Sequence, residues 1–380
     1  MNTPPDIRKG LEDVIVDTTA VSLVEGDIGR LTYRGYAVEG LLTRTFADAV
    51  YLIVFGELPN AAQRDQVEEF LWQAGSLPTA IQAIVTQMAG TSAHPMEILQ
   101  GITPMLALDS AALVTNDLAA QDAETRAGLI IAARIPTVLG VIQALRQQRA
   151  FAYPSVKRYG ARYLQLLTGK QPTAAAVDTF ERTQILQLDH SFNASTFTAR
   201  VVTSTISPVS SGLSAAMGAL YGVLHGRADQ AALEMAQTVG SPEAAAAYVA
   251  ECLASKKVVM GMGHREYRVV DPRAKVIKGL AENMELTADQ QRLFNTLVAV
   301  ETAFVEQTSH RARAMRANLE FYKGLVYLGL GLQKDYFTAS FAAARAFGWL
   351  AHINEQRKDN RIIRPDAHYI GPGLREVPAV

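Results

Sequence analysis

The sequence predicts an almost entirely helical, all-α protein. From Thr45 onward, apolar residues recur three and four positions apart in long stretches rich in Ala and Leu, which is the spacing of one buried helix face. Breaks that contain Pro or Gly separate these stretches, and neither an internal repeat nor a second composition class interrupts them. With 380 residues, 49% of them hydrophobic, the chain can form one large core or two domains that share a cleft.

The first expected element is a small β-hairpin at residues 21–33, where short alternating segments flank the turn-prone residues 25–27. The helical body follows it. The most apolar run, residues 129–145, contains Arg134 and Pro136 and is shorter than the roughly 20 residues that span a bilayer. We therefore expect a buried helix that breaks near Pro136, and no membrane association.

Two later segments have unusual composition. In residues 212–222, small residues recur three and four apart, so one helix face lets another backbone approach closely, either within the chain or from a second subunit. Residues 361–380 are rich in Pro and Gly. This composition excludes a regular helix and predicts a frayed tail or an arm that clasps a neighbour.

Charge and cysteine content exclude several classes of protein. The 36 basic and 37 acidic residues nearly cancel, so no broad positive field is available for nucleic acid or an anionic membrane. The single cysteine, Cys252, cannot form an internal disulfide or a thiolate metal site. The N-terminus has neither the apolar core of a signal peptide nor the Arg-rich character of a transit peptide, so we expect a cytoplasmic protein.

Three of the seven histidines lie in settings that simple packing does not require. His190 and Asn193 are expected on one helical face, where the imidazole either packs in the core or helps to bind an anion. His225 is expected to close the small-residue helix, as a cap or as a neutral donor that faces open space. His264 follows a Gly-Met-Gly loop whose backbone a ligand can reach. Because the three histidines do not show the HExxH spacing of a zinc site, no metal is expected.

The segment after His264 predicts a helix start close to that imidazole. Asp271 and Pro272 have the identities of an N-cap and of a first helical residue, which places Arg273 in the first turn. A dinucleotide fingerprint is a poor explanation of this loop. Glu266 stands where the third glycine is needed, and no βαβ pattern surrounds it.

Six segments, in order along the chain, together resemble the citrate synthase family. Family members usually read DHExNAST, LHGGAN, GFGHRVYxxxDPRA, NVDFYSGL, an Arg before GWLAH, and NRxIRP. The corresponding segments here are DHSFNAST, LHGRAD, GMGHREYRVVDPRA, NLEFYKGL, AAARAFGWLAH and NRIIRP. One such motif is weak evidence, but six in the same order at compatible separations are specific.

The resemblance implies the citrate synthase fold, in which the active site lies in the cleft between two helical domains. The large domain would comprise residues 1–221 and 333–380, and the small domain residues 222–332. A homodimer is implied, and no tightly bound cofactor. The implied reaction condenses a short acyl-CoA, acetyl-CoA first, with oxaloacetate or a similar keto acid, and then hydrolyses the thioester.

The resemblance also implies a role for each candidate site residue. Glu320 would remove the proton next to the thioester, His225 would steady the enol, and His264 would polarise the keto carbonyl. The residues implied to bind the keto acid are His190, Asn193, Arg273, Arg345 and, reaching in from the other subunit, Arg364. Those implied to bind coenzyme A are Lys257, Met260, Gly261, Met262 and Gly263. Such chemistry needs donors aimed at the developing enolate, and arginine binds carboxylates through its planar fork.

The chain departs from the family pattern beside these residues. Glu320 replaces an Asp and adds one methylene, Ser191 replaces a Glu, Arg227 a Gly, Asp229 an Asn and Lys323 a Ser. Because a misplacement of about 1 Å costs roughly 10² in rate, Glu320 predicts impaired or retuned activity, and Glu320→Asp is expected to raise it. Arg227 and Asp229 are expected either to pair with each other or to alter the entrance beside His225.

These departures leave two alternatives to citrate synthesis. One is 2-methylcitrate synthesis from propionyl-CoA, because one added methylene changes binding by only about 1 to 3 kcal/mol. The other is a weakly active or non-catalytic homologue with a regulatory or assembly role.

Overall fold

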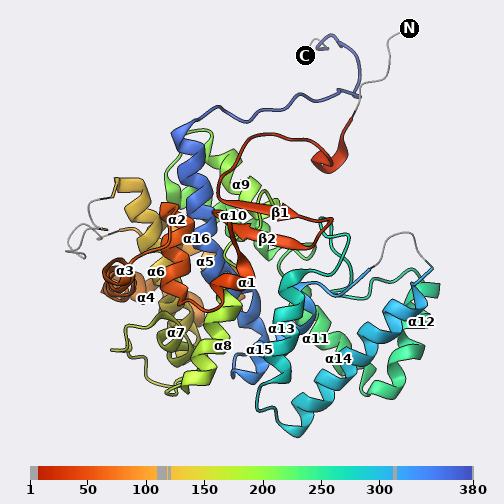
Figure 1. Ribbon diagram of the computed structural model, residues 1–380. Helices are drawn as coiled ribbons and strands as arrows, with labels where there is room; N and C mark the ends of the chain where they lie inside the picture. Colours follow the sequence, from red (N-terminus) through yellow and green to blue (C-terminus); the bar gives the residue numbers. More distant parts are fainter. Residues whose placement is uncertain (1–6, 109–117, 119–120, 311–314, 379–380) are drawn as a thin grey trace.

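The computed structural model describes residues 7–108, 118, 121–310 and 315–378, and its mainly helical architecture confirms the all-α prediction (Figure 1). The helices of the first half are α1 (Val38–Leu41), α2 (Phe46–Phe55), α3 (Ala61–Ala74), α4 (Thr79–Ala89), α5 (Pro95–Ile102), α6 (Ala123–Arg146), α7 (Tyr159–Thr168), α8 (Ala174–Ile185), α9 (Ala194–Thr203) and α10 (Val209–Tyr221). Those of the second half are α11 (Ala228–Val239), α12 (Ala245–Ala254), α13 (Pro272–Glu282), α14 (Ala288–Gln307), α15 (Leu319–Gly329) and α16 (Phe337–Lys358). Short 3₁₀ turns are η1 (Lys9–Leu11), η2 (Thr103–Met105), η4 (Pro242–Ala244) and η5 (Lys334–Tyr336).

The apolar helix α6 continues through Pro136, so the predicted break is wrong. A proline inside a helix costs about 3 kcal/mol. That loss is outweighed because each large apolar side chain that the helix buries contributes about 1.5 to 3 kcal/mol. By length and composition α6 could cross a membrane, but 94% of its most apolar window is buried inside the protein. The prediction that this segment is a buried helix is therefore confirmed.

Helix α16 forms the centre of the body and packs against α2, α6, α9 and α10. Its side chains are buried on nearly every side, as expected for a helix that carries apolar residues all round. Arg345 and His352 are the charged or titratable side chains that it carries into this core. Both find polar partners there, and both lie near the candidate site.

Gly212 and Gly218 of the small-residue segment of α10 serve packing within the chain, and a subunit interface at the same segment stays a prediction. A Cβ atom at Gly218 would lie 2.6 Å from the side-chain nitrogen of Gln100 on α5, and one at Gly212 would lie 3.0 Å from the hydroxyl of Thr203 on α9. The absence of side chains at these two positions lets three helices come together.

The predicted hairpin is confirmed. Strands β1 (Ser22–Glu25) and β2 (Arg30–Tyr33) pair antiparallel, and β3 (Tyr36–Ala37) extends the sheet in the order β1-β2-β3. The turn at Gly26 packs on the loop after His264. A Cβ atom there would lie 2.1 Å from the carbonyl oxygen of Glu266, and the Gly26 carbonyl accepts a hydrogen bond from the backbone of Arg268 at 3.0 Å. The hairpin therefore holds that loop in place.

Helices α11 to α15 pack on one another beside the rest of the body (Figure 1). Within this group α15 contacts α11, α13 and α14. Gly324 lets α11 and α15 approach closely, because a Cβ atom at this position would lie 2.7 Å from the carbonyl oxygen of Asp229 on α11. The division into a large domain and a small domain of residues 222–332 stays a prediction, and its outer limits at residues 1 and 380 lie outside the described residues.

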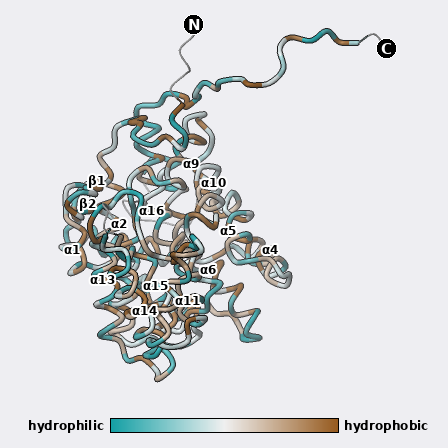
Figure 2. The backbone as a smooth tube through the Cα atoms, turned by 90° about the vertical axis from the view of Figure 1, so that its right-hand side faces the viewer, coloured by the Kyte–Doolittle hydropathy of each residue, from teal (hydrophilic) through white to brown (hydrophobic). Residues whose placement is uncertain are grey.

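Residues 360–378 form neither helix nor strand, as their composition predicted, and extend away from the helical body in both views (Figures 1 and 2). Large apolar side chains in this segment are exposed, among them Ile370 and Leu374. Its suggested function as an arm that clasps a neighbour stays a prediction.

Candidate active site

The loop before α13 presents His264 with a defined ring orientation. Gly261 and Gly263 adopt positive φ angles of 78° and 89°, which a side chain would disfavour. The Nδ1 atom of His264 accepts hydrogen bonds from the backbone N–H groups of Glu266 at 3.0 Å and Tyr267 at 3.3 Å. A ring that accepts at Nδ1 carries its proton on Nε2, and this atom lies 3.3 Å from a terminal nitrogen of Arg273. Two donors therefore lie side by side.

Arg273 is held by Asp271, which is the N-cap of α13 as the sequence predicted. Its guanidinium donates two hydrogen bonds to the carboxylate, at 3.0 Å and 2.9 Å, and both side chains are almost fully buried. Burial alone would raise the pKa of Asp271, but the Arg273 charge and its hydrogen bonds lower it below its usual range. The same carboxylate accepts a hydrogen bond from the backbone of Leu319 at 3.1 Å, which ties this loop to α15.

His190 lies in an irregular segment before α9, so its predicted place on a helical face is wrong. Ser191, with φ of 50°, turns the chain, and Asn193 is used as the N-cap of α9. The His190 Nε2 atom lies 3.3 Å from the hydroxyl of Tyr267, and its ring centroid is 5.2 Å from that of His264. Burial, followed by the charge of Arg273, lowers the pKa of His190 well below its usual range. The imidazole is therefore neutral and faces the His264 loop.

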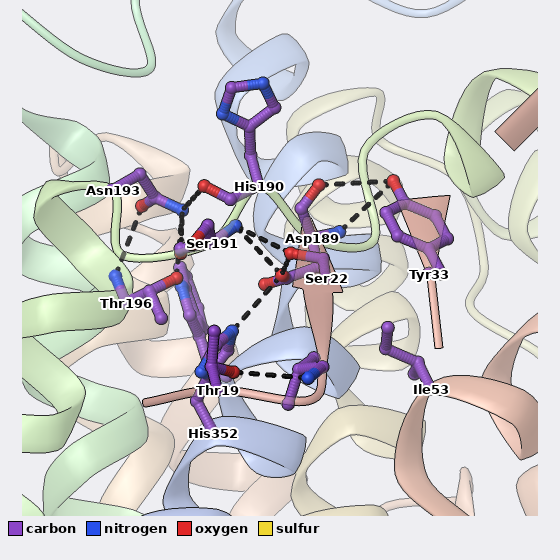
Figure 3. A network of polar contacts seen from close by, with 12 residues as sticks. Thr19, Ser22, Tyr33, Ile53, Asp189, His190, Ser191, Asn193, Thr196 and His352 are labelled. Atoms are coloured by element: carbon purple, nitrogen blue, oxygen red, sulfur yellow. Dashed lines mark hydrogen bonds and ion pairs between the residues drawn. The ribbon is translucent and has the colours of Figure 1, made fainter. Parts of the chain in front are cut away.

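A buried polar network fixes the backbone next to His190 (Figure 3). The Asp189 carboxylate accepts hydrogen bonds from the Ser22 hydroxyl at 2.5 Å and from the backbone of Ser191 at 3.0 Å, and it lies 3.2 Å from Nε2 of His352. Figure 3 shows the His190 ring pointing away from this network. The network therefore connects β1, α16 and the His190 segment, while His190 itself is directed to the site.

His225 lies in the turn after α10, which ends at Tyr221, so the prediction that it closes the helix is wrong. Its Nε2 atom is 2.9 Å from the hydroxyl of Ser195, which also accepts a hydrogen bond from the indole of Trp349 at 3.2 Å. Burial, with the charges of Arg345 and Lys323, lowers the pKa of His225 to about 4. The ring is therefore neutral at physiological pH.

Glu320 lies in the first turn of α15, where Asn318 is the N-cap. One of its carboxylate oxygens is 2.6 Å from the ammonium of Lys323, which also lies 3.4 Å from the carboxylate of Asp229. Burial raises the pKa of Glu320, although Lys323 lowers it. The suggested pairing of Arg227 with Asp229 is wrong, because Asp229 pairs with Lys323 and the Arg227 guanidinium lies over the ring of Tyr221 at 5.5 Å.

Phe341 and Gln187 connect these groups. The Phe341 ring lies 4.1 Å from the Lys323 ammonium and 4.8 Å from the Arg345 guanidinium, and its centroid is 6.5 Å from that of His225. The Gln187 carbonyl accepts a hydrogen bond from Arg345 at 2.6 Å, and its side-chain oxygen accepts one from Lys323 at 3.1 Å. Arg345 and Arg273 are close enough to lower the pKa of His190 together. The part of the site around His264 and Arg273 is therefore continuous with the part around His225 and Glu320.

A pocket of about 290 Å³ lies beside the segment that was predicted to bind coenzyme A. Lys257 and Met262 line it, together with Val259 and Phe304. Met260, Gly261 and Gly263 do not line it. Gly261 instead lets α15 approach, because a Cβ atom there would lie 2.9 Å from the backbone of Phe321.

Arg364 is not brought to this site. It lies in the exposed C-terminal segment, where it pairs with Asp366 at 3.3 Å. Within the described ranges, no group of three or more His, Cys, Asp or Glu side chains is arranged to hold a metal ion.

Sequence reasoning missed several residues that shape the site. Tyr267 and Ser195 contact the histidines, and Gln187 holds both a lysine and an arginine. Tyr267 and Ser195 lie inside the quoted motifs, so their position next to His264 and His190 was a usable signal. Gln187 lies just outside a motif and carries no such signal.

Comparison with known proteins identifies the relatives of this chain. A family model described as "Citrate synthase, C-terminal domain" matches residues 10–366. Citrate synthase 2 of Bacillus subtilis is 34% identical over 96% of both chains, and 2-methylcitrate synthase 2 of Corynebacterium glutamicum is 35% identical over 100% of this chain and 98% of its own. A solved citrate synthase of Thermoplasma acidophilum, a ternary complex with carboxymethyl coenzyme A and oxaloacetate, has a TM-score of 0.89 at 26% identity and covers 99% of both chains.

Proposed function

Because the chain belongs to the citrate synthase family, we propose that it is a condensing acyltransferase that joins a short acyl-CoA to oxaloacetate. The α-carbon of the thioester loses a proton and attacks the keto carbon of oxaloacetate, so that a carbon–carbon bond forms. Water then cleaves the thioester to release free CoA. The product is citrate from acetyl-CoA and 2-methylcitrate from propionyl-CoA.

The observation that supports this proposal most directly is the pair of donors at His264 and Arg273. The Nε2–H of His264 and the guanidinium of Arg273 lie 3.3 Å apart, and each donates rather than accepts. Two adjacent donors suit an anion with a neighbouring carbonyl, which is the arrangement of a 2-keto acid. His190 and Tyr267 lie next to His264, and Arg345 is close enough to lower the pKa of His190, so the keto acid would meet neutral imidazoles and two arginines.

The other half supplies a base and a donor for the enol. Glu320 would accept the proton from the α-carbon. The one hydroxyl proton of Ser195 has two acceptors in reach, the side-chain oxygen of Asn193 at 2.8 Å and Nε2 of His225 at 2.9 Å. In the tautomer in which Nε2 accepts it, the neutral ring carries its own proton on Nδ1, where it would stabilise the enolate oxygen. A donor of this kind is worth about 10² to 10³ in rate.

The test uses purified full-length protein, oxaloacetate and a panel of acyl-CoA thioesters, with free thiol measured over time. Release that requires oxaloacetate and favours acetyl-CoA supports citrate synthesis, and a preference for propionyl-CoA supports 2-methylcitrate synthesis. Relatives of both names match this chain at similar identity, so the assay has to decide between the two. Release without oxaloacetate would indicate thioester hydrolysis alone, and no release would favour a non-catalytic homologue.

The homodimer, with Arg364 acting on the site of the other subunit, is part of the same proposal. Its support is the exposed C-terminal segment that carries Arg364. Mixing two inactive variants, Glu320→Gln and Arg364→Ala, tests it, because a hybrid dimer regains one complete site when Arg364 acts across the interface. No recovery in hybrids that light scattering shows to be dimeric would contradict it. The cytoplasmic localisation stays a prediction.

A further inference from the structure

A buried lysine lies directly beside the proposed base. The ammonium of Lys323 is 2.6 Å from Glu320, 3.4 Å from Asp229 and 3.1 Å from the side-chain oxygen of Gln187. The contact with Gln187 is a hydrogen bond, whereas those with Glu320 and Asp229 are ion pairs whose nearest carboxylate oxygens make no hydrogen bond. The ring of Phe341 covers the ammonium at 4.1 Å. Since Lys323 and Asp229 are fully buried, water does not replace any of these partners.

Helix packing brings these three charges together. Glu320 and Lys323 lie three residues apart on α15, so their side chains leave the same face. Asp229 comes from the first turn of α11, where its carboxylate also accepts a hydrogen bond from the backbone of Gln230 at 2.7 Å. The missing side chain of Gly324, the neighbour of Lys323, lets the two helices come close enough for this contact.

The charges also balance as a set. When both carboxyls are ionised, they and the ammonium carry a net charge of −1, which is the charge that the family pattern of Asp, Ser and Asn would carry at these three positions. The departures at residues 229, 320 and 323 thus preserve the charge of the site while they lengthen the base. A longer carboxylate has one more rotatable bond, and a fixed cation restricts it.

We infer that Lys323, shared between Glu320 and Asp229, is a positioning residue for the proposed base: its ammonium fixes where the Glu320 carboxylate lies, and Asp229 competes for that ammonium. The inference rests on the proposed function. It explains why Glu320, Lys323 and Asp229 differ from the family pattern together.

The charged neighbours of Glu320 raise or lower its pKa. Burial has the largest effect and raises the pKa of Glu320; Lys323 and, from α13, Arg273 lower it, while Asp229 on α11 raises it. Burial lowers the pKa of Arg345 on α16, whereas the interaction of this arginine with the charge of Glu320 raises it. His225, in the turn after α10, is neutral and adds no charge above about pH 5. Removal of Lys323 should therefore raise the pKa of Glu320, and removal of the Asp229 charge should lower it.

The experiment measures the pH dependence of kcat/KM for CoA release. A base must be ionised to act, so activity is lost as the pH falls through the pKa of Glu320. Lys323→Met should move this acidic limb to higher pH by about one unit or more and lower kcat about tenfold to a hundredfold. Asp229→Asn should move the limb to lower pH, and the double variant should fall between them. Limbs that stay in place while activity falls in both variants would show a merely structural role and overturn the inference.

Matched variants keep the result interpretable. Lys278→Met removes another partly buried lysine–glutamate pair, the 2.9 Å contact with Glu301, and should leave the acidic limb where it is in the wild type. If Lys323→Met does not fold, Asp229→Asn decides, because it leaves the contact between Lys323 and Glu320 intact.

A second readout separates this inference from the proposed function. The ¹³C signal of the Glu320 carboxyl, assigned by its loss in Glu320→Gln, should titrate with the same opposite shifts in the two variants. This titration needs no turnover. Opposite shifts in a protein that releases no CoA would support the positioning role of Lys323 and refute the proposed function. Turnover without these shifts would refute the inference about Lys323 alone.

Discussion

The His264 loop and the start of α15 both bury carboxylates beside a cation, but the ratio of charges differs between them. Asp271 and Arg273 form a pair with two hydrogen bonds, and the pKa of Asp271 is lowered despite its burial. At α15 one ammonium, that of Lys323, serves both Glu320 and Asp229, and the pKa values of both carboxyls are raised by burial. The first region therefore keeps fixed charges, and the second can take up a proton.

This difference matches the chemistry proposed for each region. Binding a keto acid requires cations that do not change with pH, which a fully paired arginine provides. Abstraction of a proton requires a carboxylate whose proton affinity is high enough to accept one, and burial supplies this at α15. Variants at Glu320, His225 and Asp271 test this difference between the two regions.

Glu320→Gln has the largest expected effect, because it removes the proton acceptor while it keeps the size of the side chain. CoA release should fall by about 10² to 10⁴. The measurement is the thiol assay with oxaloacetate, and the exposed Glu306→Gln on α14 is the control. Turnover that stays intact in Glu320→Gln would show that Glu320 is not the base, and the functional difference between the two regions would not hold.

His225→Ala tests whether the neutral donor beside α15 acts with Glu320. Loss of one donor to the enolate should lower kcat about 10² to 10³ with little change in KM. Because the pKa of His225 lies at about 4, wild-type activity should show no titration of this ring between pH 5 and 8. Ser195→Ala, which removes the hydroxyl next to Nε2, should give a smaller loss in the same direction.

For Glu320→Asp, the structure reverses the expectation from the sequence. Shortening the side chain withdraws the carboxylate from Lys323, so activity should fall by up to about 10² instead of rising. The same change combined with Lys323→Ser and Asp229→Asn should recover most of the loss. A rise in activity for Glu320→Asp alone would show that Lys323 does not position the base.

Asp271→Asn has the smallest expected effect and concerns stability. A carboxyl whose pKa is lowered by folding stabilises the protein above its unfolded pKa of about 4, and this contribution is lost as the pH falls through the folded pKa. The variant should therefore be less stable by about 1 to 3 kcal/mol at neutral pH and should differ less from the wild type near pH 3. Denaturant unfolding at the two pH values measures this, and an equal difference at both would contradict the assignment.

Local sequence was enough to predict the helical class, the hairpin, the cap at Asp271 and the residue types that are proposed to supply the chemistry. Each of these depends on local backbone preference or on the identity of a side chain, and both can be read within a few residues. Asp271 and Pro272 predict a helix start because the cap bonds only to the first turn.

Tertiary packing determines which side chains contact one another. The ammonium of Lys323 reaches Asp229 because Gly324 lets α11 approach α15, and no local pattern states which helices touch. Pro136 stays helical because burial of α6 on all sides outweighs one lost hydrogen bond. His190 lies outside α9 because that helix begins only after its N-cap, Asn193. A charge is fixed by its residue, but its proton affinity depends on burial and on neighbours that only packing supplies.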